Sequence, residues 1–589
     1  MAPTESSPNP EMDPVIIIGA GLAGLVTTYE LAQRNIPVVL IDQEGPQSLG
    51  GQAFWSLGGL FFVNSTEQRR MGIKDSRALA LRDWLGSARF DRGWERCGEE
   101  DYWPRRWAEA FVDFAAGEME RYVKGLGAGF LMNVGWAERG DGRADGHGNS
   151  VPRFHVTWGA GPEVVRVFAE PVLAAEKKGL VRFRWRHVVD ELIVDEKTGR
   201  AMGVRGRVLE DDPVERGVSS SRVAVDKFEL RGSAVVIATG GIGGNVEAVK
   251  KAWPVDRLGP KVPESFVVGV PAHVDGRMMG IAESAGAHII NRDRMWHYTE
   301  GLQNWNPIWP AHGIRVLPAP SSLWLDATGK RLPPFLYPGS DTLATLQHIC
   351  ATGYDYTWFI LNQSIIAREF ALSGSEQNPD LTGKSIWQLL KSRVFSSKGT
   401  VPVQNFQKHG ADFVVRDDLQ SLVAGMNELL QSQSISGPQL GYDQVREVVE
   451  ARDAQVENKY CKDAQVMLVR NGREYWPDSR SRIAAPHRIL DPKHGPLIAV
   501  RMNLLTRKTL GGLETNLQSN VMREDGVTPF PGLYAAGEAA GFGGGGVHGY
   551  SSLEGTFLGG CIFSGRVAGR AISDELLQTK RARLPASRI

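Results

Sequence analysis

The sequence predicts an α/β protein whose two chain ends build one domain around a parallel sheet, with an α+β domain inserted between them. Three observations predict this fold. A strand–helix–strand pattern with a glycine-rich turn opens the chain, and glycine-dense, patterned sequence returns from about residue 505. The stretch between them is different, because it is rich in Trp and Pro and contains helical stretches such as 443–457. We expect a disordered N-terminus over 1–11, the first part of the sheet domain over 12–265, the inserted domain over 266–504 and the second part of the sheet domain over 505–589.

The expected elements of the sheet domain follow in chain order. Residues 14–18 (PVIII) form a short β-branched run, residues 22–34 carry apolar positions at helical spacing, and residues 36–42 (IPVVLID) form a second strand. Strands joined by turns are expected over 185–230. Residues 234–239 (AVVIAT) then predict another buried strand.

The turn after the first strand carries the motif Gly19-x-Gly21-x-x-Gly24. The first glycine allows a tight turn, the second lets backbone approach a pyrophosphate, and the third lets the helix pack closely on the strand. The helix N-terminus also offers free N–H groups to an anion. Asp42 ends the second strand, where an acid can bind a ribose hydroxyl, and Glu44 is the alternative. The sequence therefore predicts a Rossmann-like dinucleotide site.

The composition excludes several classes of protein. Lys+Arg and Asp+Glu number 67 each, so the net charge is zero and no nucleic-acid partner is expected. No apolar run approaches the length of a transmembrane helix. The four cysteines form no C-x-x-C pair, so no metal site is expected and a reducing compartment is indicated. We expect a cytoplasmic protein, with peripheral membrane association or peroxisomal targeting by Ser587-Arg588-Ile589 as alternatives.

Three further segments decide the kind of dinucleotide. They are Leu49-Gly50-Gly51-Gln52-Ala53 with Gly58-Gly59 behind it, Ala238-Thr239-Gly240-Gly241, and 531–538 (PGLYAAGE). With the first motif, and in this order over nearly the whole chain, they resemble the flavoproteins of the fumarate reductase/3-ketosteroid dehydrogenase superfamily. The resemblance implies FAD. It also implies a glycine-rich helix over 551–574 whose N-terminus points at the flavin N1/C2=O edge.

The cofactor-binding residues that the motifs and the resemblance imply lie at strand ends and helix starts. They are Gly19, Gly21, Leu22, Ala23, Gly24, Asp42, Gln43, Gly50, Gly51, Gln52, Gly58, Gly59, Ala238, Thr239, Gly240, Gly537, Glu538, Ser552 and Leu553. Some relatives attach FAD covalently through a histidine in the second glycine segment. Gln52 stands near that place, so we expect non-covalent FAD.

The C-terminal motif separates the branches of this superfamily. Fumarate reductases have His-Gly-x-Asn-Arg-Leu-Gly-Gly, in which the arginine grips a substrate carboxylate; here Ser552 replaces that arginine. The 3-ketosteroid Δ1-dehydrogenases place a tyrosine two residues after a histidine, as His548 and Tyr550 do. The resemblance then implies that the Tyr550 hydroxyl and the backbone N–H of Glu554 bind a C3 carbonyl, although the family has glycine where Glu554 stands.

The reaction also needs a base for the C2 proton. In the family this base is a tyrosine shortly after an Asp-x-x-Gly-x-Arg turn, which residues 326–331 match, and Tyr337 follows that turn. Because an unperturbed tyrosine has a pKa of about 10, the base needs a partner to act near neutrality. Tyr298 is the alternative catalytic tyrosine. It lies in a Trp-rich stretch that could wall a flat, apolar cleft or form an ordinary core.

Together these observations predict an FAD-dependent 3-ketosteroid Δ1-dehydrogenase, acting on a steroid or triterpenoid-like ketone. Bacterial steroid degradation and fungal steroid or triterpenoid pathways are the settings in which the resemblance places it. The electron acceptor stays open between oxygen, a quinone and another carrier. Two alternatives remain: an ene-reductase that runs the same geometry backwards on an enone without carboxylates, and a flavin-binding protein without catalysis.

Overall fold

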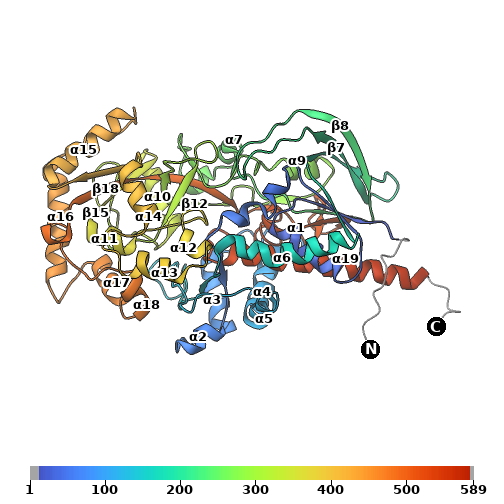
Figure 1. Ribbon diagram of the computed structural model, residues 1–589, viewed down its shortest axis with the longest axis horizontal. Coiled ribbons are helices and arrows are strands. Elements are labelled where there is room, and N and C mark those ends of the chain that lie inside the picture. The colour runs from blue at the N-terminus through green and yellow to red at the C-terminus, as the bar shows by residue number, and fades with distance from the viewer. Residues whose placement is uncertain (1–11, 584–589) are drawn as a thin grey trace.

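A six-stranded sheet forms the centre of one half of the molecule (Figure 1). The computed structural model describes residues 12–583, so the N-terminal segment 1–11 and the tripeptide Ser587-Arg588-Ile589 lie outside it. The strand order is β20-β21-β9-β1-β2-β5. The expected strand–helix–strand unit is confirmed as β1 (Val15–Ile18), α1 (Leu22–Ala32) and β2 (Val38–Ile41). The sheet is completed by β5 (Val181–Arg184), β9 (Ala234–Ile237), β20 (Asn520–Met522) and β21 (Pro529–Ala535).

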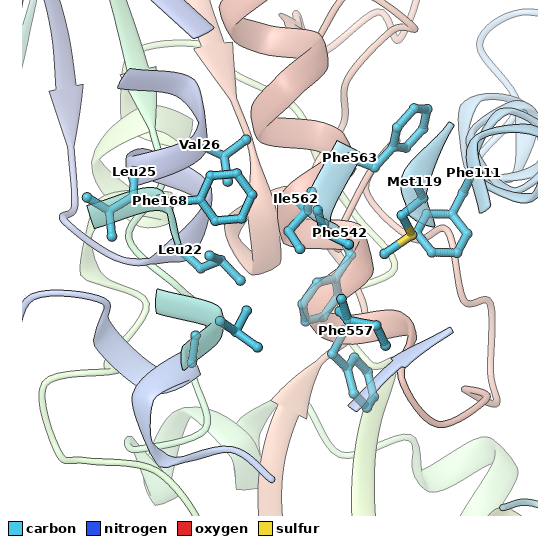
Figure 2. Packing of buried hydrophobic residues seen from close by; sticks show 14 of the residues in the cluster. Leu22, Leu25, Val26, Phe111, Met119, Phe168, Phe542, Phe557, Ile562 and Phe563 are labelled. Carbon is cyan, nitrogen blue, oxygen red and sulfur yellow. The ribbon is translucent and has the colours of Figure 1, made fainter. Parts of the chain in front are cut away.

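Both chain ends build this sheet, as the sequence predicts. β1 pairs in parallel with β2 and with β9, and β21 from the C-terminal part pairs in parallel with β9. The long helix α19 (Thr556–Arg583) packs along α1. Figure 2 shows how the apolar side chains of α1 meet Phe168 of α6 (Ala160–Lys177), while Ile562 and Phe563 of α19 continue this core toward Phe111.

A three-stranded meander packs beside this sheet, and further short elements lie in the same segments of the chain. The meander expected over 185–230 is confirmed as three antiparallel strands, β6 (His187–Val194), β7 (Ala201–Leu209) and β8 (Ala224–Arg231). The others are β3 (Gly59–Phe61), α2 (Thr66–Arg70), α3 (Arg77–Ala88), α4 (Tyr102–Gly117), α5 (Met119–Gly125), β4 (Phe154–Val156), α7 (Val246–Lys251), α8 (Val255–Leu258), α9 (Arg277–Ser284), β11 (Ile289–Ile290) and β19 (Gly512–Leu513). No helix between residues 12 and 583 is both long and apolar enough to cross a bilayer.

The second half of the molecule is built on an eight-stranded sheet centred on β18 (Leu497–Thr509). Its other strands are β10 (Val267–Val268), β12 (Met295–Gln303), β13 (Gly313–Leu317), β14 (Leu323–Asp326), β15 (Tyr356–Asn362), β16 (Ala371–Leu372) and β17 (Phe413–Arg416). Its helices include α10 (Thr342–Thr352), α11 (Gln363–Glu369), α12 (Pro379–Thr382), α13 (Ile386–Leu389), α14 (Val401–His409), α15 (Leu419–Ser432), α16 (Tyr442–Glu457), α17 (Ala464–Gly472) and α18 (Trp476–Ser481). β18 runs across the expected boundary at 504/505, and the domain boundaries themselves stay a prediction.

The C-terminal helix begins later than the sequence predicts. We expected it over 551–574, whereas α19 begins at Thr556 and continues to Arg583. Gly555 has φ +89°, which is outside the α-helical region, so the helix cannot include it. Residues 551–553 belong to no helix or strand, and Glu554 and Gly555 form a turn directly before the helix starts.

Candidate functional site

A long cavity runs along the edge where the strands of the first sheet end and reaches into the second half of the molecule. Its open space, including the mouth, is about 1670 Å³. The expected cofactor residues that line it are Gly19, Gly21, Leu22, Ala23, Asp42, Gln43, Gly50, Gly51, Gln52, Gly58, Gly59, Ala238, Thr239, Gly240, Gly537 and Glu538. Four segments far apart in the sequence therefore meet on one cavity.

The three glycines of the first motif have different surroundings. Gly21 is the N-cap of α1 and has no side-chain cap, so the first N–H groups of the helix face the cavity. A Cβ on Gly21 would meet only the Ala238 carbonyl oxygen, at 3.9 Å. A Cβ on Gly24 would lie 2.0 Å from the Gly19 carbonyl oxygen. Gly21 thus keeps space open for a ligand, while Gly24 allows close packing.

The acid at the end of β2 is held in place by backbone. Asp42 accepts hydrogen bonds from the N–H groups of Ala20 and Glu44, each at 2.8 Å. The neighbouring Glu44 carboxylate binds the Ser220 hydroxyl (2.6 Å) and the Arg222 guanidinium (2.5 Å). Each of the two carboxylates therefore has a protein partner on both oxygens, and both residues line the cavity, so Asp42 and Glu44 both remain candidates for binding a ribose hydroxyl.

The middle of the cavity holds a chain of hydrogen bonds that fixes Glu538. Gln52 Nε2 donates to Glu538 Oε2 (2.7 Å), and the Thr509 N–H donates to Glu538 Oε1 (2.8 Å). Lys508 Nζ in turn donates to Gln52 Oε1 (2.9 Å). Burial lowers the pKa of Lys508 below its ordinary value. This arrangement presents fixed polar groups to any ligand that occupies the cavity.

The far end of the cavity combines an ion pair with a tyrosine. Arg315 of β13 pairs with Glu554, which lies just before α19. The Arg315 guanidinium also lies over the ring of Tyr298, 3.8 Å from the centroid, and 3.4 Å from Glu138. Burial, followed by the Glu554 carboxylate, raises the pKa of Tyr298 above its ordinary value, so its hydroxyl stays protonated near neutrality. This wall offers a hydroxyl donor and a carboxylate acceptor.

A second arginine lines the same end. Arg507 Nη1 lies 3.4 Å from Ser373 Oγ, which is a long contact, and its buried Nε has no hydrogen-bond partner in the described part of the chain. Sequence reasoning missed Arg315, Arg507 and Lys508. Each is a single basic residue on a strand, and no motif spacing marks it. Arg507 and Lys508 could have been found because they stand directly before the stretch Thr509-Leu510-Gly511-Gly512, which contains another glycine pair.

Two of the four expected catalytic residues do not line this cavity. Tyr550 is buried between the guanidinium groups of Arg257 and Arg294, which lie 3.5 and 4.1 Å from its ring centroid. Tyr337 follows the expected turn at the end of β14, where Asp326 N–H donates to the Lys330 carbonyl. Burial raises the pKa of Tyr337 to about 12. Tyr298 and Glu554 do line the cavity, so they are brought together with the cofactor residues.

Ser552 and Leu553 were expected at the cofactor but are absent from the cavity lining. Both are buried, and the Ser552 hydroxyl binds within its own segment, to the Leu553 carbonyl (3.2 Å) and Thr556 Oγ1 (3.0 Å). Gly555 and Phe557, on either side of the start of α19, line the cavity in their place. The positive end of the α19 dipole therefore lies at the far end of the site.

The residues that line the cavity provide the features that FAD binding requires. An uncapped helix N-terminus begins at Gly21, where a Cβ would enter open space, an acid is fixed at the end of β2, and a second helix N-terminus lies at the opposite end. A pyrophosphate suits the first helix end, and the flavin N1/C2=O edge suits the second. The fold and the site together define a flavin-dependent oxidoreductase.

Comparison with known proteins agrees with this class. A family model described as an FAD binding domain matches residues 14–558. A KsdD-like steroid dehydrogenase of Mycolicibacterium smegmatis is 60% identical over 562 residues, which cover 95% of this chain and 99% of the relative. The chain therefore belongs to the FAD-binding flavoprotein family and, within it, to the KsdD-like steroid dehydrogenases. It is an FAD-dependent oxidoreductase acting on CH–CH groups.

Two solved structures share the fold. The 3-ketosteroid Δ1-dehydrogenase of Sterolibacterium denitrificans in complex with 1,4-androstadiene-3,17-dione has a TM-score of 0.67 at 13% identity, covering 96% of this chain and all of that one. The 3-ketosteroid Δ4-(5α)-dehydrogenase of Rhodococcus jostii with 4-androstene-3,17-dione has a TM-score of 0.59 at 17% identity, covering 97% and 98%. A fungal origin for this chain stays a prediction, as does non-covalent attachment of FAD.

Proposed function

We propose that the chain is an FAD-dependent steroid dehydrogenase that introduces a C1–C2 double bond beside the C3 ketone of a steroid or steroid-like substrate. The observation that carries the proposal is the wall formed by Tyr298, Arg315 and Glu554 beside the start of α19. Such a desaturation removes a proton from C2 and a hydride from C1. When bound, FAD supplies the hydride acceptor.

The residues at this wall suit the two remaining tasks. The protonated Tyr298 hydroxyl donates a hydrogen bond to the C3 carbonyl, which makes the C2 proton more acidic. The Glu554 carboxylate accepts that proton. Arg315 holds Glu554 in place and, stacked on Tyr298, fixes the tyrosine ring. A carboxylate base avoids the difficulty that a buried tyrosine with a raised pKa stays protonated near neutrality and therefore cannot accept the proton.

The role of Tyr550 in binding the C3 carbonyl and the role of Tyr337 as the base remain predictions. The family spacing favours them, whereas the lining of the cavity favours Tyr298 and Glu554. The electron acceptor that regenerates oxidised FAD is left open between oxygen, a quinone and another carrier.

The test is anaerobic mixing of the purified, FAD-loaded protein with a panel of 3-ketosteroids that are saturated at C1–C2. We expect loss of the oxidised flavin absorbance without added reductant, and a product lighter by two hydrogens with the new double bond at C1–C2. A double bond at C4–C5 would overturn the C1–C2 assignment. An unchanged flavin spectrum with every steroid, together with rapid reoxidation of the dithionite-reduced protein by an enone, would favour the ene-reductase instead.

A further inference from the structure

Residues 383–401 (GKSIWQLLKSRVFSSKGTV) form an exposed apolar and basic segment on the surface of the second half of the molecule. We call it the apolar-basic segment. It comprises α13, the π-helical turn η3 (Leu390–Val394) and the loop that leads into α14. Trp387 is 84% exposed, Phe395 78%, Ile386 66% and Val401 62%. Large apolar side chains gathered in this way on a protein surface mark an interaction site.

The charge of the segment is as distinctive as its apolar side chains. It contains four basic residues and no Asp or Glu. Lys384 pairs with Glu163, and Arg393 pairs with Asp380. Lys391 and Lys398 are exposed, and neither makes an ion pair with any residue that the structure describes. The outer surface of the segment is therefore apolar and positively charged.

Neighbouring side chains extend this surface. Trp387, Leu390, Lys391 and Phe395 line a shallow hollow. Trp476, at the start of α18, is 59% exposed, and α18 packs against η3. Tryptophan and lysine together are typical of surfaces that lie in the interfacial layer of a bilayer, because the indole prefers the headgroup region and the ammonium attracts anionic lipids.

The segment is fastened to the wall of the cavity. Arg393 Nη2 donates to Asn378 Oδ1 (2.7 Å), and Asn378 Nδ2 donates to the carbonyl oxygens of Leu372 (2.8 Å) and Gly374 (2.6 Å). These two residues flank Ser373, which lines the cavity. Figure 1 shows α12 and α13 beside one end of α6. Arg393 of the segment is thus connected through Asn378 to the backbone on both sides of Ser373 in the cavity wall.

We propose that the apolar-basic segment binds the surface of an anionic lipid bilayer. Ile386, Trp387 and Phe395 enter the interfacial layer, and Lys391 and Lys398 contact the lipid phosphates. The arrangement brings the cavity close to the phase into which an apolar steroid partitions, a benefit that rests on the proposed function. Binding of the bilayer itself does not depend on that function.

The experiment measures co-sedimentation of the FAD-loaded protein with vesicles, first of phosphatidylcholine mixed with phosphatidylglycerol and then of phosphatidylcholine alone. We expect binding to the anionic vesicles that weakens with added salt. The partition coefficient of the triple variant Ile386→Ser/Trp387→Ser/Phe395→Ser should be lower than that of the wild type by a factor of at least about ten. On anionic vesicles the partition coefficient of Lys391→Glu/Lys398→Glu should fall by a similar factor. The matched control is Val223→Ser/Val225→Ser, which removes two exposed apolar side chains at the β6–β8 meander and should bind like the wild type.

Two results would overturn the proposal. One is wild-type protein that stays in the supernatant with both kinds of vesicle. The other is a self-associating wild type that the triple variant converts to a monomer while vesicle binding is unchanged, which would make the segment a contact between copies of the chain. Circular dichroism and flavin content show whether each variant is folded. Because no turnover is measured, a failure here is separate from a failure of the steroid assay.

Discussion

The Arg315 guanidinium forms an ion pair with the Glu554 carboxylate, although the two residues are 239 positions apart in the sequence. Arg315 belongs to β13 of the eight-stranded sheet, and Glu554 precedes α19, which packs on the FAD-binding half. The pair therefore joins the two halves of the molecule at the wall of the cavity. Both side chains are largely buried, so the pair is shielded from bulk water and from salt.

The substitution Glu554→Gln should remove the acceptor for the C2 proton while keeping the size of the side chain. We expect the rate of flavin reduction by a 3-ketosteroid to fall by about 10² or more, the usual contribution of a positioned base. Stopped-flow absorbance measures this rate, and the visible spectrum before mixing shows that FAD is still bound. If the E554Q variant reduced its flavin at the wild-type rate, this carboxylate would be excluded as the base.

Substituting three tyrosines one at a time should show whether the catalytic tyrosine is the one that lines the cavity or one of the two that the family spacing marks. Tyr298→Phe removes a hydroxyl that faces the cavity, so kcat should fall at least tenfold. Tyr337→Phe and Tyr550→Phe keep the buried rings and, on our proposal, leave kcat near the wild-type value. Steady-state assays with one steroid and an artificial electron acceptor measure all three. The reverse pattern would return the catalytic role to Tyr550 or Tyr337.

Two glycines of one motif should respond differently to alanine. Gly21→Ala should leave the thermal stability of the FAD-free protein unchanged but weaken FAD binding at least tenfold, because its methyl group enters the space for the phosphates. Gly24→Ala should lower the stability of the FAD-free protein by about 1–3 kcal/mol, because its Cβ would overlap the Gly19 carbonyl. Thermal unfolding and FAD titration distinguish the two effects. Equal changes in both variants would contradict the separation of roles.

Glu376 should make the protein less stable as the pH rises. Burial raises the pKa of this carboxyl to about 7, and its Oε2 has no hydrogen-bond partner among the described residues. An acid whose pKa is raised by folding contributes stability that is fully present when the pH is below the pKa of the unfolded state. This stability is lost as the pH rises through the pKa of the folded state. Compared with the wild type, Glu376→Gln should gain up to about 3 kcal/mol between pH 4.5 and pH 8. Denaturant unfolding at both pH values measures the difference, and a difference independent of pH would refute the assignment.

FAD should separate from the protein on denaturation, because Gln52 and not a histidine stands in the second glycine segment. Acid precipitation should leave the flavin colour in the supernatant and a colourless pellet. Flavin that stays with the pellet, or with the chain in a denaturing gel, would show a covalent bond at another residue.

Much of the fold follows from local patterns in the sequence. The β1–α1–β2 unit could be predicted because its β-branched strands, its glycine turn and the helical spacing of its apolar residues all agree. The start of α19 could not, because the left-handed φ of Gly555 is a property of the folded backbone and not of residue type. A glycine-rich stretch before a helix leaves its first turn undefined in the sequence.

The candidate site also contains residues that sequence motifs predict and residues that only the folded chain brings together. Residues on turns, such as Gly21 and Asp42, could be predicted because a motif fixes both their spacing and the direction of the backbone. Arg315 could not, since its partner Glu554 is distant in sequence and the pair exists only after the two halves meet. For Tyr550, the spacing from His548 gave a position in the chain, but the direction of the side chain depends on the arginines that enclose it.

β18 is a single unbroken strand of 13 residues that serves both halves of the molecule. Its first part pairs with β15 in the inserted sheet, and its last residue, Thr509, donates the backbone hydrogen bond that fixes Glu538. Because an extended strand cannot lengthen, the inserted sheet cannot drift from the flavin-binding wall without breaking that bond. β18 therefore holds the eight-stranded sheet at a fixed spacing from the cavity wall that presents Glu538.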